Sequence, residues 1–321
     1  MIKTKIFKAT QIDEVVSLLK NGGLVALPTE TVYGLAADAL NEAAIQKIFK
    51  AKGRPSNHPL IVHIDSFDKI DPWCQDISIA AKKLADNFWP GSLTMIFNKR
   101  NNVSNSITGG LNTIAIRIPN HPVILEVISK LGNGIAAPSA NAHQKTSPTS
   151  SMHVLKTLDG KIAGIVDSGV CAVGIESTII DMTKEIPIIL RPGAITVEMI
   201  EKVLGINIEN PIYHNEKVSG NMKNHYQPEK PLFIFTIDQI ESLSKEETNI
   251  AIIHYSKISK TENAIYYTMP KNKAEYTKIF YSTLHSIDNT NVAKVLVETP
   301  PSSIEWADIN DRLIKASAKA T

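Results

Sequence analysis

The sequence contains few cysteines and no long apolar run, and both absences narrow the class of protein. Its two cysteines, Cys74 and Cys171, lie far apart without a Cys-x-x-Cys pair, which disfavours a disulfide framework and a structural zinc site. The amino-terminal stretch MIKTKIFKAT lacks the apolar core of a signal peptide, and no apolar run approaches membrane-spanning length. These absences predict a cytoplasmic protein without a membrane partner.

Common nucleotide-binding and catalytic motifs are also missing. Neither GxxxxGK[ST] nor GxGxxG occurs, so an ATP site in this chain would need a cluster of basic side chains instead of a Walker cradle. There is no HExxH or other metal-ligand spacing, and no compelling Ser-His-Asp order. The formal net charge of +2 is too small to predict nucleic-acid binding from bulk electrostatics, so an RNA contact would require a local patch.

What is present is enough apolar sequence for a sizeable core. With 321 residues, of which 43 % are hydrophobic, the chain has the length of two domains. Segments with the period of strands alternate with amphipathic helical segments, which predicts an α/β fold but leaves the strand order open. The main predicted strands are 24–27, 60–64, 93–97, 113–118, 177–181, 188–190, 232–235, 250–254, 264–267 and 293–297. The main predicted helices are 78–88, 122–131, 152–158, 195–204, 273–287 and 308–318.

The stretch 23–64, a strand, a turn, a helix and a second strand, is the part around which the rest is organised. Asn41 can cap its helix and Gly53 can end it, with Lys52 in the last turn and Arg54 just beyond. Cations at the end of a helix are stabilised by the helix dipole whether or not they have a function, so a purely structural interpretation is the alternative. A proline-flanked loop beside a hydroxyl-rich turn supports a functional interpretation, because fixed ammonium and guanidinium groups suit a polyphosphate.

The predicted strand 113–118 alternates between isoleucines and other residues. With its isoleucines in the core, Thr113 and Arg117 share the opposite face, where the arginine could hold a carboxylate. The alternative is an ordinary solvated sheet face. His63 is set apart by the same alternation in the strand 60–64, where a partly buried structural histidine is the competing interpretation.

Seven motifs then point to a family. In order they are PTETVYGL, KGRP followed by PLIVHI, WPGSLT at 89–94, IAIRIP around Arg117, the triplet Ser139-Ala140-Asn141, GIESTIID at 174–181 and ILRPG at 189–193. Together they resemble the threonylcarbamoyl-AMP synthase family with its YrdC-like catalytic domain, and the remainder resembles the carboxyl-terminal domain of the longer members. The resemblance implies a twisted mixed-sheet α/β catalytic domain at 1–208, a linker over the active site at 209–231, and a smaller Rossmann-like α/β domain at 232–321.

The resemblance also implies an activity. Family members are nucleotidyltransferases that condense L-threonine, bicarbonate and ATP into threonylcarbamoyl-AMP and pyrophosphate, for modification of the adenosine next to the anticodon of certain tRNAs. By matching position, the residues that bind L-threonine would be Thr31, His63, Arg117, Ala137 and Ser177. Those that hold ATP would be Lys52, Arg54, His58, Thr113, Ser139, Asn141, Ser147, Arg191 and Tyr226. Lys52, Arg54 and Arg117 would be catalytic, and Mg²⁺ would accompany ATP without a metal site on the protein.

The chain departs from the family pattern at two positions. His58 stands where the family usually has asparagine before PLIVH, and Ser219 stands where the linker usually has proline. The expected partners are a downstream tRNA threonylcarbamoyl transferase and double-stranded RNA or tRNA. Two other functions stay open: a nucleic-acid-binding module with a concave basic surface, and a carbamoyl-transfer enzyme of hydrogenase maturation. The latter enzymes also carry an acylphosphatase-like region and cysteine-rich zinc fingers, which this sequence lacks.

Overall fold

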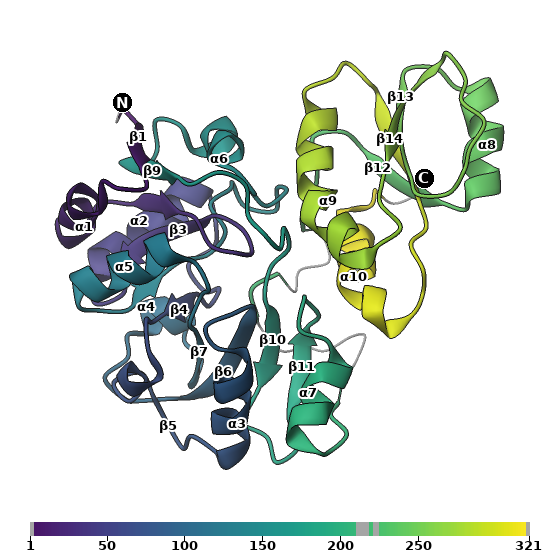
Figure 1. The fold of residues 1–321 in the computed structure, drawn as a ribbon. Coiled ribbons are helices and arrows are strands. Elements are labelled where there is room, and N and C mark those ends of the chain that lie inside the picture. The colour runs from purple at the N-terminus through teal and green to yellow at the C-terminus, as the bar shows by residue number, and fades with distance from the viewer. Residues whose placement is uncertain (1–2, 210–217, 221–224, 319–321) are drawn as a thin grey trace. The chain divides into compact units, whose positions relative to one another are not determined.

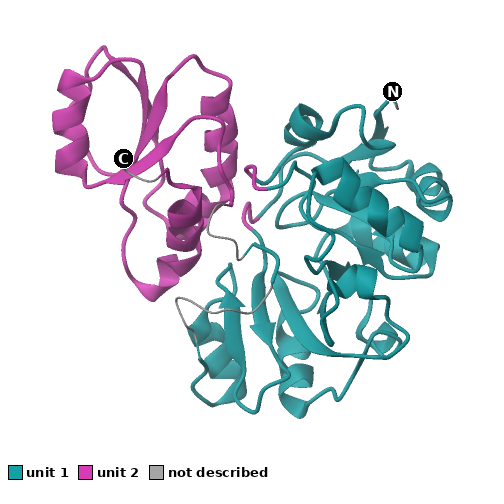
Figure 2. Ribbon diagram, turned by 180° about the vertical axis from the view of Figure 1, so that it is seen from behind, with its two compact units in different colours: residues 1–143, 147–172, 176–221 teal, residues 144–146, 173–175, 222–321 magenta. Residues whose placement is uncertain are grey.

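The computed structural model describes residues 3–209, 218–220 and 225–318 (Figure 1). These form two compact units (Figure 2), the first with residues 1–143, 147–172 and 176–221, the second with residues 144–146, 173–175 and 222–321. Residues 210–217 and 221–224 of the predicted linker lie outside the described residues. The course of that linker over an active site therefore stays a prediction.

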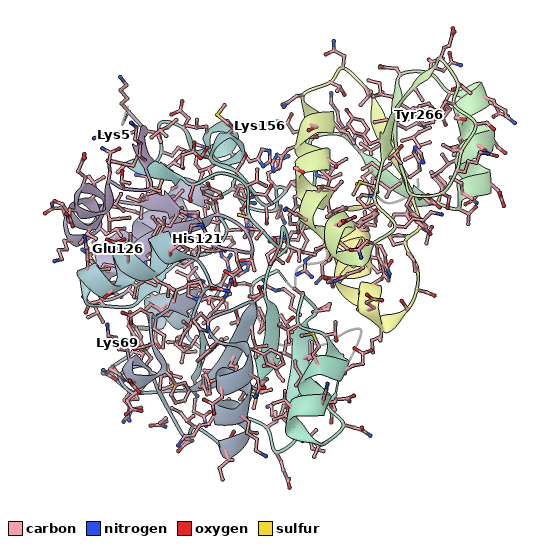
Figure 3. All side chains as sticks on the ribbon, viewed as in Figure 1. Lys5, Lys69, His121, Glu126, Lys156 and Tyr266 are labelled. Carbon is pink, nitrogen blue, oxygen red and sulfur yellow. The ribbon has the colours of Figure 1, made fainter. Side chains whose placement is uncertain are left out.

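An eleven-stranded mixed sheet forms the frame of the first unit. Ten strands follow one another in the order β1–β9–β2–β3–β8–β4–β7–β6–β10–β11, and β5 pairs with β6. Their bounds are Lys5–Lys8, Gly164–Asp167, Val25–Leu27, Gly34–Asp38, Ile135–Ala136, Ile61–His63, Thr113–Arg117, Leu93–Lys99, Thr178–Asp181 and Ile188–Arg191, with Cys74–Gln75 for β5. Charged side chains such as Lys5, Lys69 and Glu126 extend outward from this unit (Figure 3).

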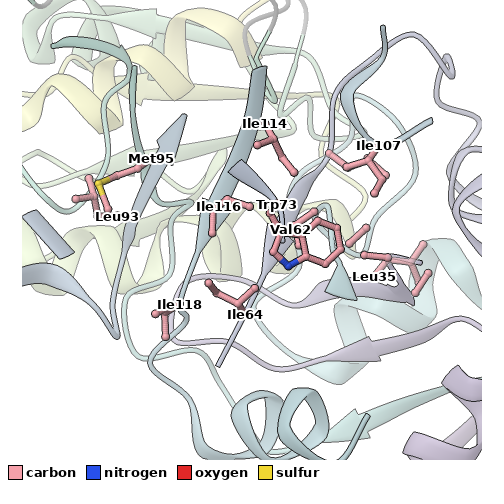
Figure 4. Packing of buried hydrophobic residues seen from close by; sticks show 14 of the residues in the cluster. Leu35, Val62, Ile64, Trp73, Leu93, Met95, Ile107, Ile114, Ile116 and Ile118 are labelled. Atoms are coloured by element: carbon pink, nitrogen blue, oxygen red, sulfur yellow. The ribbon is translucent and has the colours of Figure 1, made fainter. Parts of the chain in front are cut away.

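One face of this sheet packs against the main hydrophobic core. Val62, Met95 and Ile116 come from neighbouring strands, and all three are fully buried in it (Figure 4). Four helices contribute their apolar stripes to the same core, namely α2 (Glu42–Lys52), α3 (Ile79–Phe88), α6 (Ser151–Leu158) and α7 (Val197–Leu204). The short helix α4 (Asn105–Thr108) adds Ile107. Removal of this apolar surface from water provides the main stabilisation of the unit.

The opposite face of the sheet is divided into two regions. Over the strands from β1 to β8 it is covered by α1 (Ile12–Lys20) and α5 (Pro122–Leu131), whose buried residues form a second cluster. Over β4, β7, β6, β10 and β11 it carries a small apolar cluster, made of Ile61, Ile96, Ile179 and Leu190. We call this second region the site face.

Strand register decides which side chains reach the site face. β4 and β7 run parallel, with His63 opposite Arg117 and Ile61 opposite Ala115. Since side chains alternate along a strand, Thr113 and Arg117 share this face while the isoleucines of β7 enter the core, as the sequence predicts. The alternative of a solvated sheet face is wrong for Arg117, which is only 4 % exposed.

The second unit contains a four-stranded sheet in the order β12–β15–β13–β14, with every pair parallel. The bounds of these strands are Leu232–Phe235, Lys294–Glu298, Ile250–His254 and Ala264–Thr268. Three helices accompany the sheet, α8 (Ile237–Glu246), α9 (Lys273–Asp288) and α10 (Ala307–Ala316). This arrangement confirms the smaller Rossmann-like α/β unit that the sequence predicts.

Most predicted elements occur within a few residues of their expected bounds, and α5 matches exactly the range 122–131. The sequence pattern did not predict β1, β3, β5 or the short α4. β3 reads Gly-Leu-Ala-Ala-Asp, which has no β-branched residue, and it forms because β2 and β8 pair with it on either side. Within the described ranges, no helix combines the length and apolar character needed to cross a bilayer.

Candidate active site

The turn between β2 and β3 is organised by the side chain of Thr29. Its Oγ1 accepts hydrogen bonds from the backbone N–H of Thr31 at 3.1 Å and of Val32 at 3.2 Å. Threonine favours turns because its hydroxyl can satisfy backbone groups in this way. The Thr29 and Thr31 hydroxyls also lie 2.8 Å apart, so the turn holds Thr31 in one orientation, 1 % exposed.

Arg117, at the end of β7, is fixed by three groups from two parts of the chain, the turn after β2 and Gly91. Its Nε donates to the carbonyl of Gly91 at 3.0 Å, and its NH1 donates to Oγ1 of Thr31 at 2.9 Å. Its NH2 forms an ion pair with Oε1 of Glu30 at 2.5 Å. The guanidinium is therefore both oriented and neutralised, and the N–H groups of its NH2 make no hydrogen bond within the described residues.

Glu30 is a buried member of this site that the sequence reasoning missed. It is 7 % exposed; its Oε1 accepts from the hydroxyl of Ser92 at 3.1 Å and its Oε2 from the backbone N–H of Asn120 at 3.1 Å. A glutamate in a polar turn usually faces solvent, so nothing in the pattern distinguished it. Its position inside the PTET motif, directly before Thr31, is the one available signal.

His63 lies opposite Arg117 on the site face and is 3 % exposed. Burial, and secondly the positive charge of Arg117, lower its pKa from 6.5 to about 3, and a hydrogen bond with the backbone of Ile61 opposes this shift. The imidazole is therefore neutral at pH 7. Ala137, also predicted near threonine, follows β8 and is bonded through its N–H to the carbonyl of Ile61 at 3.1 Å.

Lys52 ends α2 and is buried at 4 % exposure. Its Nζ donates to the carbonyl of Ser139 at 2.5 Å and to that of Asn141 at 2.6 Å, which joins two parts of the predicted ATP group. Burial, and secondly the charge of Arg54, hold the pKa of Lys52 well below its usual value. An approaching phosphate would favour the charged form of this lysine.

Arg54 follows the Gly53 cap and forms a basic corner with two histidines. Its NH2 donates to the carbonyl of Pro59 at 2.9 Å. His58 and His143 lie nearby with ring centroids 5.7 Å apart. Burial lowers the pKa of His143 to about 4, and the charge of Arg54 contributes next. His143 was not predicted; its backbone N–H donates to the carbonyl of Lys52 at 2.8 Å.

Arg191 connects this corner with Ser177. Its NH2 donates to the carbonyl of Ser177 at 2.8 Å and to its Oγ at 3.1 Å, and the Ser177 hydroxyl lies 2.7 Å from that of Thr94. Its NH1 donates to the carbonyl of Ser219 at 2.9 Å. Gly193 makes the close approach of this segment possible, since a Cβ there would lie 2.4 Å from the backbone nitrogen of Thr178.

A shallow pocket, partly open to solvent, lies on the site face. It is mainly apolar and is lined by Pro59, Leu60, Ile61, Ile96, Leu111, Thr113, Ala115, Ile179, Val218 and Ser219. Arg54 bonds to two of the lining residues, the carbonyl of Pro59 at 2.9 Å and Oγ of Ser219 at 3.4 Å. Arg117 lies two residues beyond Ala115 on β7. An apolar pocket next to a few fixed polar groups is typical of small-molecule sites.

The remaining predicted residues have contacts of different kinds. Ser147 donates to the buried Glu176 at 2.5 Å, and Asn141 donates through Nδ2 to the carbonyl of Ala142 at 3.0 Å. Tyr226 belongs to the second unit and is 1 % exposed. The guanidinium carbon of Arg312 lies over the ring of Tyr226, 5.1 Å from the ring centroid. Its predicted contact with ATP stays a prediction.

The chemistry available to these residues is recognition of anions. The described part of the chain has no group of three or more His, Cys, Asp or Glu side chains arranged to hold a metal ion. It does have Arg117, held in one orientation beside the hydroxyl of Thr31. It also has a second, basic region with Lys52, Arg54 and Arg191, and an apolar pocket on the site face. Such a set can bind a carboxylate and a phosphorylated ligand side by side.

Two family models match the chain. One, described as "Telomere recombination" and named Sua5_yciO_yrdC, matches residues 17–193. The other, described as "Threonylcarbamoyl-AMP synthase, C-terminal domain", matches residues 195–318. The first match ends two residues after Arg191 and contains all the residues predicted to bind threonine.

Curated proteins and solved structures show the same likeness over nearly the full length. The chain is 40 % identical to the threonylcarbamoyl-AMP synthase of Bacillus subtilis, covering 96 % of this chain and 93 % of the relative. It is 38 % identical to the protein of the same name from Pyrococcus abyssi, covering 93 % and 92 %. The crystal structure of P. abyssi Sua5 complexed with L-threonine superposes with a TM-score of 0.91 at 36 % identity, covering 98 % of each chain.

Proposed function

The chain belongs to the threonylcarbamoyl-AMP synthase family, and on that premise we propose how its own residues perform the family's reaction. It makes threonylcarbamoyl-AMP and pyrophosphate from L-threonine, bicarbonate and ATP, for threonylcarbamoyladenosine modification of tRNA. One observation supports the assignment of its site: Arg117 and the apolar pocket lie on the same face of one sheet.

A relative crystallised with L-threonine supports this amino acid as a substrate, and in our proposal it binds at Arg117. The free donors of the guanidinium take the substrate carboxylate, since a planar pair of N–H groups matches two carboxylate oxygens. Neutral His63 and the hydroxyls of Thr31 and Ser177 line the same region without adding charge that would compete for the carboxylate. Ala137 contributes through its backbone, since its side chain packs in the second apolar cluster.

ATP binds at the apolar pocket and the basic corner. The pocket takes the flat adenine ring, and Thr113 offers a hydroxyl at its edge. Lys52, Arg54 and Arg191 neutralise the phosphates, with His58, Ser139, Asn141 and Ser147 as further polar groups around them. Magnesium enters with ATP as part of the substrate, which suits an ion held mainly by phosphate oxygens and water.

The reaction then needs little covalent participation by the protein. The deprotonated amine of threonine takes up bicarbonate with loss of water and becomes a carbamate. A carbamate oxygen attacks the α-phosphorus, and as this bond forms, the bond from that phosphorus to the pyrophosphate oxygen breaks. Lys52, Arg54 and Arg117 accelerate the step by holding two anions in contact and by stabilising the charge on the phosphates, at about 3–4 kcal/mol for a well-placed contact.

Pyrophosphate release tests this proposal. We expect release from ATP that depends on both threonine and bicarbonate, with threonylcarbamoyl-AMP detected by mass spectrometry. Calorimetry should show that Arg117→Ala weakens threonine binding about 100-fold, near the 3 kcal/mol of a charged hydrogen bond, and ATP binding much less. Arg54→Ala should reverse that order. Equal losses for both ligands in the two variants would refute the division of the site.

The partners beyond these substrates are also proposals. The product would pass to a tRNA threonylcarbamoyl transferase, because an acyl phosphate anhydride needs a second enzyme to deliver its acyl group. A module that only binds double-stranded RNA is the competing function, and tight RNA binding without threonine-dependent pyrophosphate release would favour it. A hydrogenase-maturation enzyme is not favoured, since the family model matched at 195–318 is the synthase carboxyl-terminal domain.

A further inference from the structure

Arg117 is held by three contacts that differ in character. Nε donates to a backbone carbonyl and NH1 donates to a hydroxyl, both neutral acceptors, whereas NH2 meets the carboxylate of Glu30 at 2.5 Å. The ion pair is almost completely removed from water, with side-chain exposures of 4 % for the arginine and 9 % for the glutamate. A buried pair of this kind keeps a fixed geometry, because either charge left alone would be costly.

Glu30 is itself held from two other places in the chain. Ser92, just before β6, donates to Oε1, and the backbone N–H of Asn120, after β7, donates to Oε2. Both carboxylate oxygens are thus engaged by groups that flank two different strands of the sheet. The carboxylate therefore has a fixed position relative to β6 and β7, and its ion pair fixes the guanidinium of Arg117 relative to the same two strands.

We propose that Glu30 is a positioning residue for the amino acid substrate, because its carboxylate fixes Arg117 in the orientation that receives the substrate carboxylate. The inference rests on the proposed function of Arg117 and adds a residue that does not itself touch the substrate. Glu30 also has an opposing effect, since its negative charge repels a second carboxylate at the same guanidinium. The proposal requires that its hold on the geometry of Arg117 outweighs this repulsion.

The test separates these two effects. Glu30→Gln keeps the size of the side chain and one carbonyl oxygen but removes the charge. If positioning dominates, the KM for threonine rises about tenfold, as loss of a charged contact allows, while kcat and the KM for ATP stay within about twofold. If repulsion dominates, the KM for threonine falls, and that result would overturn the proposal, as would an unchanged KM.

A matched control and a double-mutant cycle complete the experiment. Glu126→Gln removes the charge of an exposed glutamate on α5 (Figure 3) that pairs with Lys130, and should leave both KM values unchanged. In an Arg117→Ala background, Glu30→Gln should change threonine binding less than about twofold, since the residue acts through Arg117. A further tenfold change in that background would show an independent role and contradict positioning.

Two further points keep the outcome decisive. Should the buried glutamine prevent folding, Ser92→Ala is the alternative variant, because it removes only the hydrogen bond from the Ser92 hydroxyl to the Glu30 carboxylate. A rise of about twofold to threefold in the KM for threonine is then expected, without a change in the KM for ATP. An unchanged threonine KM in that variant would count against the proposal. Threonine-dependent pyrophosphate release by the unmodified protein tests the proposed function separately, so its failure is not confused with failure of the role of Glu30.

Discussion

At the scale of single residues, burial determines the chemistry of this site. Lys52, His63 and Arg117 are 4 %, 3 % and 4 % exposed, and removing a charge from water costs several kcal/mol unless it is compensated. Arg117 is compensated by Glu30, Lys52 by two carbonyls, and His63 by remaining neutral. Alternation along β7 predicted the face of Arg117. It could not predict Glu30, because a pairing between distant residues leaves no local pattern.

His63 makes the stability of the protein sensitive to acid. Its pKa falls from 6.5 to about 3 on folding because burial disfavours the cation, so between these values the unfolded chain binds a proton that the folded chain does not. The contribution of neutral His63 is complete above pH 6.5 and decreases by about 1.4 kcal/mol for each pH unit below it. His63→Gln removes this titration.

Urea denaturation at pH 7 and pH 5 measures the effect. We expect the free energy of unfolding to decrease by about 2 kcal/mol more in the unmodified protein than in His63→Gln over that interval. All other histidines are the same in both proteins, so the difference isolates His63. An identical pH dependence in the two proteins would mean that the pKa of His63 is the same in the folded and unfolded chains, which would contradict this prediction.

At the scale of elements, helix ends were the most predictable features, and strands without a composition signal the least. Asn41 accepts from the backbone N–H of Ala44 at 3.0 Å and Gly53 adopts a left-handed φ of 63°, so both predicted caps of α2 are confirmed. These ends matter for the site because they fix where Lys52 and Arg54 emerge. β3 was missed since only its partners β2 and β8, not its small side chains, select an extended conformation.

Gly53→Ala tests whether the end of α2 sets the position of the basic corner. A Cβ at this residue would meet no atom within 4 Å, so the cost is the left-handed backbone alone, about 1 kcal/mol. We expect this loss of stability together with a rise of about threefold in the KM for ATP, because Arg54 follows directly. The KM for threonine should change less.

Gly205→Ala is the matched control for this prediction. Gly205 ends α7 with a φ of 71°, and a Cβ added there would also meet no atom within 4 Å. The Gly205→Ala variant should therefore lose the same stability without any change in the KM for ATP. The same increase in that KM for both variants would indicate a general effect of lower stability. Thermal unfolding and steady-state kinetics on the two variants decide between these outcomes.

At the scale of the whole molecule, the class of fold was predictable and the order of its strands was not. Strand and helix periods come from local burial, so they can be recognised within about ten residues. The order β1–β9–β2 places residues 164–167 between two strands from the first thirty residues, and no local pattern encodes that pairing. The resemblance to a family supplied the mixed sheet and the second unit, and both are confirmed.

Truncation at two positions tests how much of the first unit's site depends on residues after 208. Within that unit, Val218 packs on the apolar cluster of the site face, and Ser219 bonds to Arg54 and Arg191. A chain ending at 208 loses both, exposes the cluster and removes one hydrogen-bonding partner of each arginine, so we expect threonine-dependent pyrophosphate release to fall at least about tenfold. A chain ending at 220 keeps these contacts and should release pyrophosphate faster than the shorter one. An unchanged rate in the chain ending at 208 would show that the site needs none of these later residues.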